Sequence, residues 1–345
     1  MPPRPNARFL TIRHPPFNPH FYDELLTWTG NNLPEVLPRF DLRTLPCRVP
    51  DDVEVVLHIP WLQDPVQNWS LEVYEQANTL AAECDARNIP IINRVDRLLN
   101  TTKFLGASLI AGPDLRTPRM KKLAEPRDLA EAAAEIGLPL LVREDWGHGG
   151  TLIVVRTGAE LRRVSLARFR RPVAIEFVDV AGEDGLYRKY RYIAAGDEGV
   201  SHHLQISEDW QTRGFNRLKA DAARDEEIAY TNAPDRNHAA FQRARRALGL
   251  DLVAFDYSYD REGRTIVWEA NAYPHLTFSR KSYLHKNAPM HRTHYAIMQL
   301  YLQRAGLPIP GKIQDRLARI RQQPIGVPSD VTTPADPERS TASAP

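Results

Sequence analysis

Val267-Trp268-Glu269-Ala270-Asn271-Ala272-Tyr273-Pro274 is the most informative stretch of this chain of 345 residues. One residue separates Glu269 from Asn271, so on a β-strand their side chains point to the same face. A second strand-like segment, residues 252–259, precedes this stretch across a polar turn. Together the two segments predict an antiparallel hairpin in which Asp256 lies opposite Glu269.

Two carboxylates and one side-chain amide would meet at the end of this hairpin. The Mg²⁺ ion takes oxygen ligands in octahedral geometry and is usually held by one or two carboxylates together with substrate phosphates. Asp256, Glu269 and Asn271 provide oxygen ligands of this kind. The alternative is an ordinary polar hairpin that holds no ligand, and this segment alone does not exclude it.

A glycine-rich segment lies upstream of the hairpin. An apolar strand at residues 139–143 ends in Arg143, the segment Trp146-Gly147-His148-Gly149-Gly150 follows, and residues 151–155 form a second strand. Glycine reaches backbone conformations closed to other residues and lets N–H groups approach a polyphosphate. The pattern predicts a hairpin loop over phosphates, although an ordinary hairpin turn also uses glycine.

Two more strands follow the glycine-rich segment. Residues 173–179 form an apolar strand whose end could present backbone groups to an adenine edge, and the alternative is a plain buried strand. Residues 187–193 alternate basic with aromatic or aliphatic side chains, which places Tyr187, Lys189 and Arg191 on one face. That face could supply cations to a cleft, whereas a strand edge protected by charge is the structural alternative.

This order of elements resembles the ATP-grasp superfamily, in particular its RimK-like, ribosomal-protein-modifying and glutathione-synthetase-like carboxylate–amine ligases. The resemblance covers residues 90–280 and is most specific at Asp256 and the Glu-x-Asn element. It implies an α/β chain in which a small N-terminal parallel-sheet domain precedes two α+β subdomains that sandwich ATP. The implied parts are residues 1–95, an ATP-grasp domain at 96–305 with a phosphate-loop subdomain (96–175) and a metal-binding subdomain (176–305), and a Pro-rich tail (306–345) expected to be largely disordered.

The resemblance also implies roles for individual residues, with ATP and Mg²⁺ as cofactors, two metal ions in the site and Mn²⁺ as a substitute. Arg191 and Arg143 would act in catalysis, and Arg191 would stabilise the acyl phosphate and the developing oxyanion. The metal ligands would be Asp256, Glu269 and Asn271. The nucleotide would be bound by Lys103, Arg143, Gly147, His148, Gly149, Gly150, the backbone of Glu176 and Val178 with Phe177 between them, and Glu183 at the ribose.

Arg143 departs from the family pattern, in which a lysine ends the strand before the loop. Arginine stays charged and can bind two phosphate oxygens with its planar fork, so nucleotide binding is compatible with the change. Its geometry differs from that of an ammonium group, which affects the alignment of the transferred phosphate. His148 is also unusual in such a loop, and it could either donate to a phosphate or be an exposed loop residue.

The reaction implied by the resemblance forms a carbon–nitrogen bond at the expense of ATP. A substrate carboxylate attacks the γ-phosphorus to give an acyl phosphate, and an amine then displaces phosphate. The substrates would be a small-molecule or peptide carboxylate and an amine. Two alternatives stay open: a kinase that phosphorylates an alcohol on the same nucleotide site, and a non-catalytic ATP-binding or interaction module.

Composition restricts the remaining classes. The chain has 45 basic and 43 acidic side chains and a net charge of +2, which gives no electrostatic reason to expect nucleic acid as a partner. Its two cysteines indicate neither a disulfide framework nor a zinc site. Because no apolar run approaches the ~20 residues of a membrane span and the opening residues lack the apolar core of a secretory signal, we expect a cytoplasmic protein without membrane contact. A homo-oligomer is expected only from the general frequency of dimers.

The N-terminal region is harder to interpret. Many prolines interrupt the first 50 residues, which therefore stay unassigned. Residues 53–59, 69–87 and 89–93 predict a strand, a helix and a strand, hence a parallel sheet. His58 at the end of the first strand would face either the cleft or the core. Further helices are predicted at residues 96–111, 126–137, 235–248 and 289–304.

Overall fold

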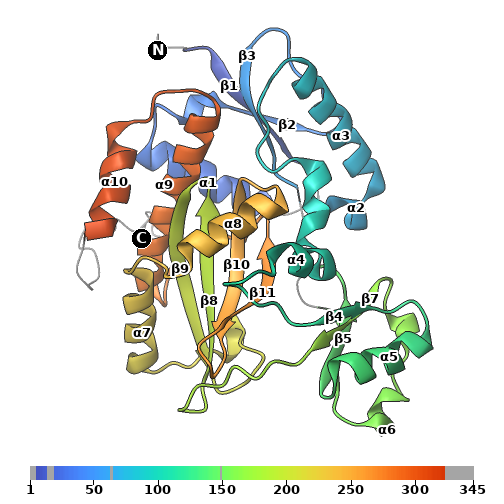
Figure 1. Ribbon diagram of the computed structural model, residues 1–345. Helices are drawn as coiled ribbons and strands as arrows, with labels where there is room; N and C mark the ends of the chain where they lie inside the picture. The colour runs from blue at the N-terminus through green and yellow to red at the C-terminus, as the bar shows by residue number, and fades with distance from the viewer. Residues whose placement is uncertain (1–4, 14–18, 63–64, 148–149, 323–345) are drawn as a thin grey trace, which may run out of the picture.

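Three sheets organise the protein (Figure 1). The computed structural model describes residues 5–13, 19–62, 65–147 and 150–322. The N-terminal sheet is parallel, and the two sheets that follow are antiparallel. The predicted α/β class, with a small parallel sheet followed by α+β regions, is confirmed.

The parallel sheet has the strand order β2-β1-β3. Its strands are β1 (Ala7–Arg13), β2 (Phe40–Thr44) and β3 (Glu54–Pro60). Helix α1 (Pro19–Asn32) and the short 3₁₀ helix η1 (Leu37–Arg39) connect β1 to β2, and α2 (Val66–Trp69) and α3 (Leu71–Ala86) follow β3. Of the prolines that left the first 50 residues unassigned, Pro19 begins α1, where a missing N–H costs little.

The predicted strand at residues 89–93 is wrong in extent. Ile91 forms an isolated parallel bridge to β3 instead. The chain leaves the sheet at Asn93, whose backbone has a left-handed φ of 48°. The side-chain amide of Asn93 donates to the carbonyl oxygens of Leu252 and Ala272, at 2.7 and 3.1 Å, and these bonds hold the segment against the next sheet rather than in its own.

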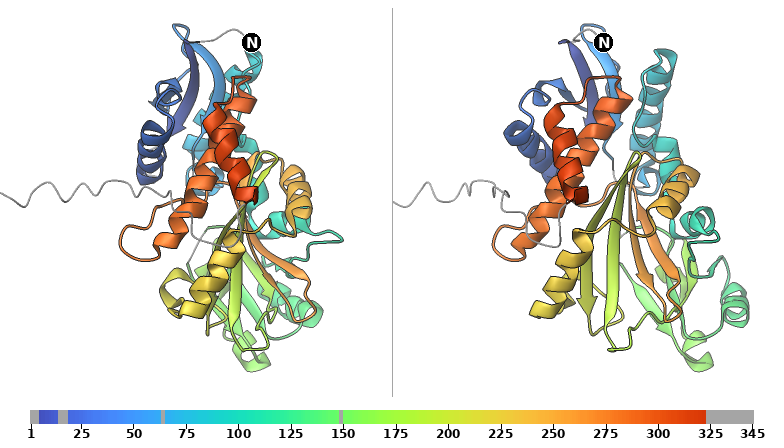
Figure 2. Two further views of the ribbon diagram at one scale, coloured as in Figure 1. Left: turned by 90° about the vertical axis from the view of Figure 1, so that its left-hand side faces the viewer. Right: turned by 60° about the vertical axis from the view of Figure 1, so that its left-hand side comes forward.

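The second sheet is antiparallel, with the strand order β11-β10-β8-β9. Its strands are β8 (Tyr187–Ala195), β9 (Glu198–Ser207), β10 (Leu252–Tyr259) and β11 (Thr265–Asn271). Helix α8 (His238–Leu248) packs Phe241 against Tyr192 and Phe255 on one face. Helices α7 (Asp221–Thr231) and α9 (Asn287–Arg304) lie against β9 on the other side of the sheet (Figures 1 and 2).

The third sheet, also antiparallel, has the order β4-β7-β5-β6. Its strands are β4 (Met120–Lys122), β5 (Leu140–Glu144), β6 (Leu152–Val155) and β7 (Pro172–Glu176). Helix α5 (Pro126–Ile136) covers it, with Pro126 in the first turn and Gly137 as C-cap, as predicted. The short helix α6 (Gly158–Leu161) and the 3₁₀ helix η3 (Leu166–Arg168) lie between β6 and β7.

The predicted helix at residues 96–111 is broken in two. A 3₁₀ helix, η2 (Val95–Thr101), precedes helix α4 (Lys103–Ile110), and the extended backbone of Thr102 separates them. Asp145 causes the break, because its carbonyl accepts from the N–H of Lys103 and its carboxylate accepts from the N–H of Phe104, each at 2.7 Å. These bonds satisfy the donors of a new helix start.

Two of the hydrophobic cores join the N-terminal sheet to the second sheet. One contains Phe9 and Leu57 together with Ile193 and Leu300. The other lies on the opposite faces of the same two sheets, where Leu10 of β1 and Tyr192 of β8 are buried. The third sheet has a separate and smaller core, built within residues 123–174. The molecule therefore consists of a large body and a smaller lobe, the latter at the lower right of Figure 1.

The C-terminal part of the described chain belongs to the body. Helix α10 (Gly311–Gln322) packs on α9, and its Ile313 and Leu317 enter the core that contains Phe9. The remainder of the predicted Pro-rich tail lies outside the described residues. None of the helices in the described ranges combines the length and apolar character that a membrane crossing requires.

Candidate functional site

The hairpin of β10 and β11 has the register that the sequence predicts. Asp256 pairs with Glu269, and Asn271 lies further along the same strand as Glu269. The register shifts directly after Asp256, which leaves Trp268 as an extra residue in β11. All three predicted metal ligands, Asp256, Glu269 and Asn271, line one cavity.

Cations from two other elements pair with these carboxylates. Arg191 of β8 donates two hydrogen bonds to Asp256, from Nε to Oδ1 at 2.6 Å and from Nη2 to Oδ2 at 2.9 Å. Lys189 lies on the same face of β8, with Nζ 3.8 Å from Asp256. Lys103, at the start of α4, donates to Glu269 Oε2 at 2.8 Å.

The charges shift one another's pKa values in a consistent way. Burial lowers the pKa of Arg191, but the charge of Asp256 and the hydrogen bonds to it outweigh that effect, so the net pKa is raised. Burial lowers the pKa of Arg143, the carboxylate of Glu269 opposes this, and the nearby Arg213 adds to it. Arg143 and Arg213 thus bring like charges together, an arrangement that an anion would stabilise.

The cavity has a volume of about 620 Å³ and lies between the second and third sheets. Its polar end is lined by the two paired carboxylates and by five cationic side chains: Lys103, Arg143, Lys189, Arg191 and Arg213. With Glu176 included, five cations face three carboxylates among the described residues that line the cavity, an excess of two positive charges. Such an excess in a half-enclosed site favours a polyanionic ligand.

The other end of the cavity is apolar. Side chains from all four strands of the lobe sheet line it, together with a pair of aromatic rings: Met120, Leu141, Leu152, Ile175, Phe177 and Trp210. The rings of Phe177 and Trp210 meet edge to face with centroids 5.2 Å apart. Across the described residues, the N–H and C=O groups of Phe177 and Val178 make no main-chain hydrogen bond, so they remain available to a planar polar ligand.

The glycine-rich loop lies beside the N-terminal region. Gly147 and Gly150 have φ values of 80° and 77°, which residues with a side chain rarely adopt. The ring of Trp146 meets that of Trp69 of α2 at a centroid distance of 5.0 Å and an angle of 81°. Arg143 Nη2 lies 3.4 Å from the carbonyl oxygen of Gly147, so the loop and the cationic end of the cavity are in contact.

No protein-family model and no curated protein matches the sequence. The similarity to known proteins is therefore found only by comparing structures. A RimK domain ATP-grasp protein from Sphaerobacter thermophilus has a TM-score of 0.52 at 15% identity, covering 85% of this chain and 99% of that one. D-alanyl-alanine synthetase A from Vibrio cholerae has a TM-score of 0.57 at 12% identity, covering 88% and 100%. The VanG D-Ala:D-Ser ligase from Enterococcus faecalis has a TM-score of 0.53 at 13% identity, covering 92% and 99%.

The chain has the ATP-grasp fold. Its cavity between two antiparallel sheets is the place where the sequence predicts that ATP is sandwiched. The fold prediction made from the hairpin and the glycine-rich loop is therefore confirmed. Identity this low establishes the fold and leaves the reaction to the residues of the site.

Most of the predicted site residues come together in the ATP-grasp cavity. The side chains of Lys103, Arg143 and Arg191 line its polar end, and Glu176, Phe177 and Val178 line its apolar end. Gly147 contacts Arg143 at the cavity without lining it, and Gly150 does not line it either. His148 and Gly149 fall outside the described residues, so their predicted roles stay predictions.

Other candidates are not brought to the cavity. Glu183 lies in an exposed turn before β8 and does not line it. His58 belongs to the core: its Nδ1 bonds to the carbonyl of Leu10 at 2.9 Å, and burial lowers its pKa to about 4. Two further histidines, His202 and His203 of β9, also have a pKa that burial lowers well below the usual value, and neither lines the cavity.

The sequence interpretation missed several residues of the site. Lys189 was placed on the correct face by the alternation in β8, but no motif marked it as a site residue. Arg213 and Trp210 lie in the loop after β9, a segment without a recognisable pattern. Loops of this kind carry functional side chains whose positions depend on tertiary contacts.

Proposed function

We propose that this protein is an ATP-dependent carboxylate–amine ligase that binds Mg-ATP between its two antiparallel sheets and acts through an acyl phosphate. The observation that carries the proposal is the convergence of Asp256, Glu269 and Asn271 with the cations Lys103, Arg143 and Arg191 in one cavity of an ATP-grasp fold. Its substrates would be a small-molecule or peptide carboxylate and an amine.

The donor set fits a hard divalent cation. Two carboxylates and one amide oxygen lie on neighbouring strands, and Asp256 stands directly opposite Glu269. Oxygen ligands of this type suit Mg²⁺ and also Mn²⁺, and they leave coordination positions for phosphate oxygens. When bound by Asp256, Glu269 and Asn271, the metal would neutralise phosphate charge and orient the polyphosphate.

The two ends of the cavity give the nucleotide an orientation. The adenine ring fits the apolar end, where the available N–H and C=O groups of Phe177 and Val178 can bind its polar edge. The phosphates fit the cationic end, where Lys103, Arg143 and Lys189 offer charge-assisted hydrogen bonds. In this orientation the γ-phosphate would lie at the end of the cavity that Arg191 lines.

The chemistry follows from this placement. An oxygen of the substrate carboxylate attacks the γ-phosphorus of ATP, the bond to the β-phosphate oxygen breaks, and ADP leaves. The amine nitrogen then attacks the carbonyl carbon of the acyl phosphate, inorganic phosphate leaves, and the amine gives a proton to solvent. The protein contributes chiefly position and charge, because the transferred group needs in-line alignment rather than a protein nucleophile.

Arg191 would stabilise the charge that develops in both steps. Its guanidinium lies at the polar end of the cavity, where two hydrogen bonds join it to Asp256. A fixed cation aimed at a developing oxyanion contributes roughly 3 kcal/mol in comparable sites. Histidine general bases are not required by this mechanism, in agreement with the burial of His202 and His203.

Trapping with hydroxylamine tests the proposal. Purified protein is incubated with Mg-ATP, a pool of carboxylic acids and hydroxylamine, and hydroxamate and ADP are measured. Glu269→Gln removes a predicted metal ligand and is expected to abolish both products. Glu262→Gln is the matched control, since Glu262 is exposed on the same hairpin and pairs with Arg264 away from the cavity.

The outcomes separate the possible functions. Hydroxamate that disappears in Glu269→Gln and persists in Glu262→Gln supports the ligase. ADP with a stable phosphorylated alcohol and no hydroxamate would assign the site to a kinase. Nucleotide binding without either product, across amino acid, peptide and dicarboxylate pools, would favour a non-catalytic ATP-binding module.

A further inference from the structure

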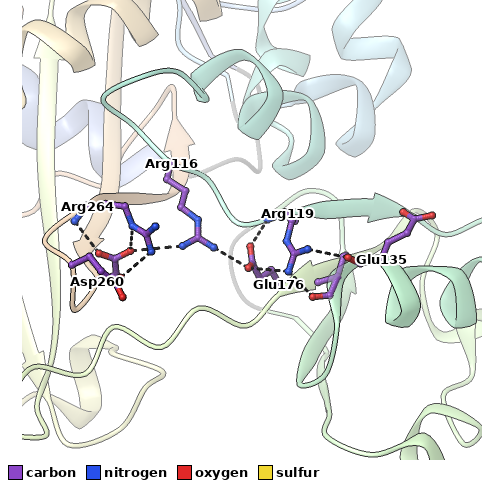
Figure 3. A network of polar contacts seen from close by, with 8 residues as sticks. Arg116, Arg119, Glu135, Glu176, Asp260 and Arg264 are labelled. Atoms are coloured by element: carbon purple, nitrogen blue, oxygen red, sulfur yellow. Dashed lines mark hydrogen bonds and ion pairs between the residues drawn. The ribbon is translucent and has the colours of Figure 1, made fainter.

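An alternating chain of charges crosses from the body to the lobe beside the cavity (Figure 3). It begins at the turn between β10 and β11, where Arg264 donates to Asp260, and it continues from Arg116 to Glu176 and Arg119. We call this set of five residues the crossing chain. Arg116 and Arg119 precede β4 and Glu176 ends β7, so the crossing chain involves both segments that connect the body to the lobe.

Glu176 is the centre of the crossing chain. Its Oε1 accepts from Arg116 Nη2 at 2.8 Å and from Arg119 Nη2 at 3.2 Å, and its Oε2 accepts from the N–H of Arg119 at 2.9 Å. The main-chain N–H of Glu176 donates to the carbonyl of Arg119 at 2.8 Å. Both carboxylate oxygens are therefore engaged with these arginines, and the side chain of Glu176 is only 13% exposed.

Arg116 belongs to the body through its main chain. Its N–H donates to Thr265 at 2.9 Å and its carbonyl accepts from Val267 at 2.8 Å, so it forms a parallel bridge with β11. Its side chain reaches the other way, to Glu176 at the end of β7 in the lobe. A second contact, 3.7 Å from Arg116 Nη1 to Asp260, holds the guanidinium from the side of the body.

Arg119 fixes the other side of Glu176. Its guanidinium donates to the carbonyl oxygens of Glu135 and Ile136, at 2.9 and 2.6 Å, at the last turn of α5. A cation at a helix C-terminus satisfies orphan carbonyl groups and interacts favourably with the helix dipole. Glu176 is thus held by one arginine anchored in the body and one anchored in the lobe.

The crossing chain matters for ligand binding because of the position of Glu176 in the sequence. Glu176 is the last residue of β7, and Phe177 and Val178, whose polar main-chain groups face no partner in the described main chain, follow directly. Any rotation of Glu176 would move these groups relative to the metal-binding hairpin. Arg116 itself does not line the cavity.

We propose that Arg116 is a positioning residue for adenine recognition, acting through Glu176 to hold the main chain of Phe177 and Val178 at a set distance from the β10–β11 hairpin. This inference rests on the proposed function, because it assumes that the base binds at the apolar end of the cavity. Loss of Arg116 should weaken the contribution of the base to binding and spare the contribution of the phosphates.

Two ligands that differ in the adenosine moiety test this role. Dissociation constants of ATP and of inorganic tripolyphosphate, each with Mg²⁺, are measured by calorimetry for the wild type, Arg116→Ala and Glu176→Gln. Lys121→Ala is the matched control, because Lys121 of β4 makes its ion pairs with Glu131 and Glu135, which both belong to the lobe. Thermal unfolding midpoints of all variants are recorded to separate positioning from loss of structure.

We expect Arg116→Ala to bind ATP about 10-fold more weakly and tripolyphosphate as the wild type does, which is the size of effect that one charged hydrogen bond carries. Glu176→Gln should act in the same direction, and the double variant should lose less than the sum of the two. The positioning role would be overturned if Arg116→Ala lost affinity equally for both ligands, or if it bound ATP as well as Lys121→Ala does. Neither result would contradict the proposed ligase function. Failure of the wild type to bind ATP would instead remove the proposed function, and this inference with it.

Discussion

Arg191 and Asp256 face each other across β8 and β10 as directly paired residues, and two hydrogen bonds of 2.6 and 2.9 Å join their side chains. Lys103 and Glu269 form a second pair of this kind at 2.8 Å. Two of the three predicted metal ligands therefore already carry a cation as partner. A metal ion that arrives alone must compete with these cations, whereas a metal that arrives with phosphates offers them new anionic partners.

We therefore expect metal binding to depend on nucleotide. Mn²⁺ titrated into the protein and followed by electron paramagnetic resonance should bind at least about 10-fold more weakly without ATP than with it. Arg191→Ala should strengthen binding of Mn²⁺ alone, because it removes the partner of Asp256. Arg188→Ala is the control, since Arg188 lies on the other face of β8 and pairs with Asp184 and Glu226. Equally tight binding of Mn²⁺ with and without nucleotide would contradict this view.

Substitutions of Arg143 test whether an arginine can bind phosphate at the position where the family pattern has a lysine. Arg143→Ala should raise the KM for ATP by about 10- to 100-fold, as expected for the loss of a charge-assisted hydrogen bond to phosphate. Arg143→Lys should keep part of the affinity through its charge but lower kcat, because an ammonium cannot reproduce the two-pronged contact. Arg156→Ala, at an exposed position after β6, should behave as the wild type. A lysine variant that outperforms the wild type would show that the fork is not used.

His58 should make stability depend on pH. Burial lowers its pKa from 6.5 to about 4, so between these values the unfolded chain binds a proton that the native protein does not. Stability is then fully present above pH 6.5 and is lost as the pH falls toward 4, at up to about 1.4 kcal/mol per pH unit. We expect the free energy of unfolding in urea to fall by about 2 kcal/mol less in His58→Gln than in the wild type when the pH is lowered from 7 to 5. An identical loss in both proteins would exclude this origin.

The contact between Trp69 and Trp146 should help to hold the start of the glycine-rich loop against α2. An edge-to-face pair of aromatic rings is worth roughly 0.5–1.5 kcal/mol, so Trp69→Leu should weaken ATP binding by about 2- to 10-fold. Calorimetry measures this change, and tryptophan fluorescence should respond less to ATP in the variant. Leu71→Ala serves as control, because Leu71 is close in sequence and 61% exposed. If the two variants bind ATP equally well, the ring contact does not govern the loop.

The parts of the site that the sequence predicts correctly are those set by local pattern. The alternation around Glu269 and the short turn before it determine the register opposite Asp256, since a slip by one residue would reverse every side chain. Helix α5 has a proline at its start and a glycine at its end, and both signals act within a few residues. Such features need no knowledge of distant contacts.

The parts that could not be predicted depend on contacts distant in sequence. The break at Thr102 follows from bonds to Asp145, and the turn at Asn93 follows from bonds to Leu252. Periodicity alone predicts one continuous helix through Thr102 and a strand that extends to Asn93. The pairing of Arg116 with Glu176 is also invisible in the sequence, because nothing local connects residues 60 positions apart.

The separate core of the lobe has a consequence for local unfolding. Its buried side chains come from residues 123–174 and are shared with neither of the larger cores, so the lobe can open at a lower free energy than the body. Amide hydrogens of β4 to β7 should then exchange with solvent before those of β8 to β11. A ligand held between the two sheets would slow exchange mainly in the lobe, and a bound nucleotide would then complete the hydrophobic interior of that region.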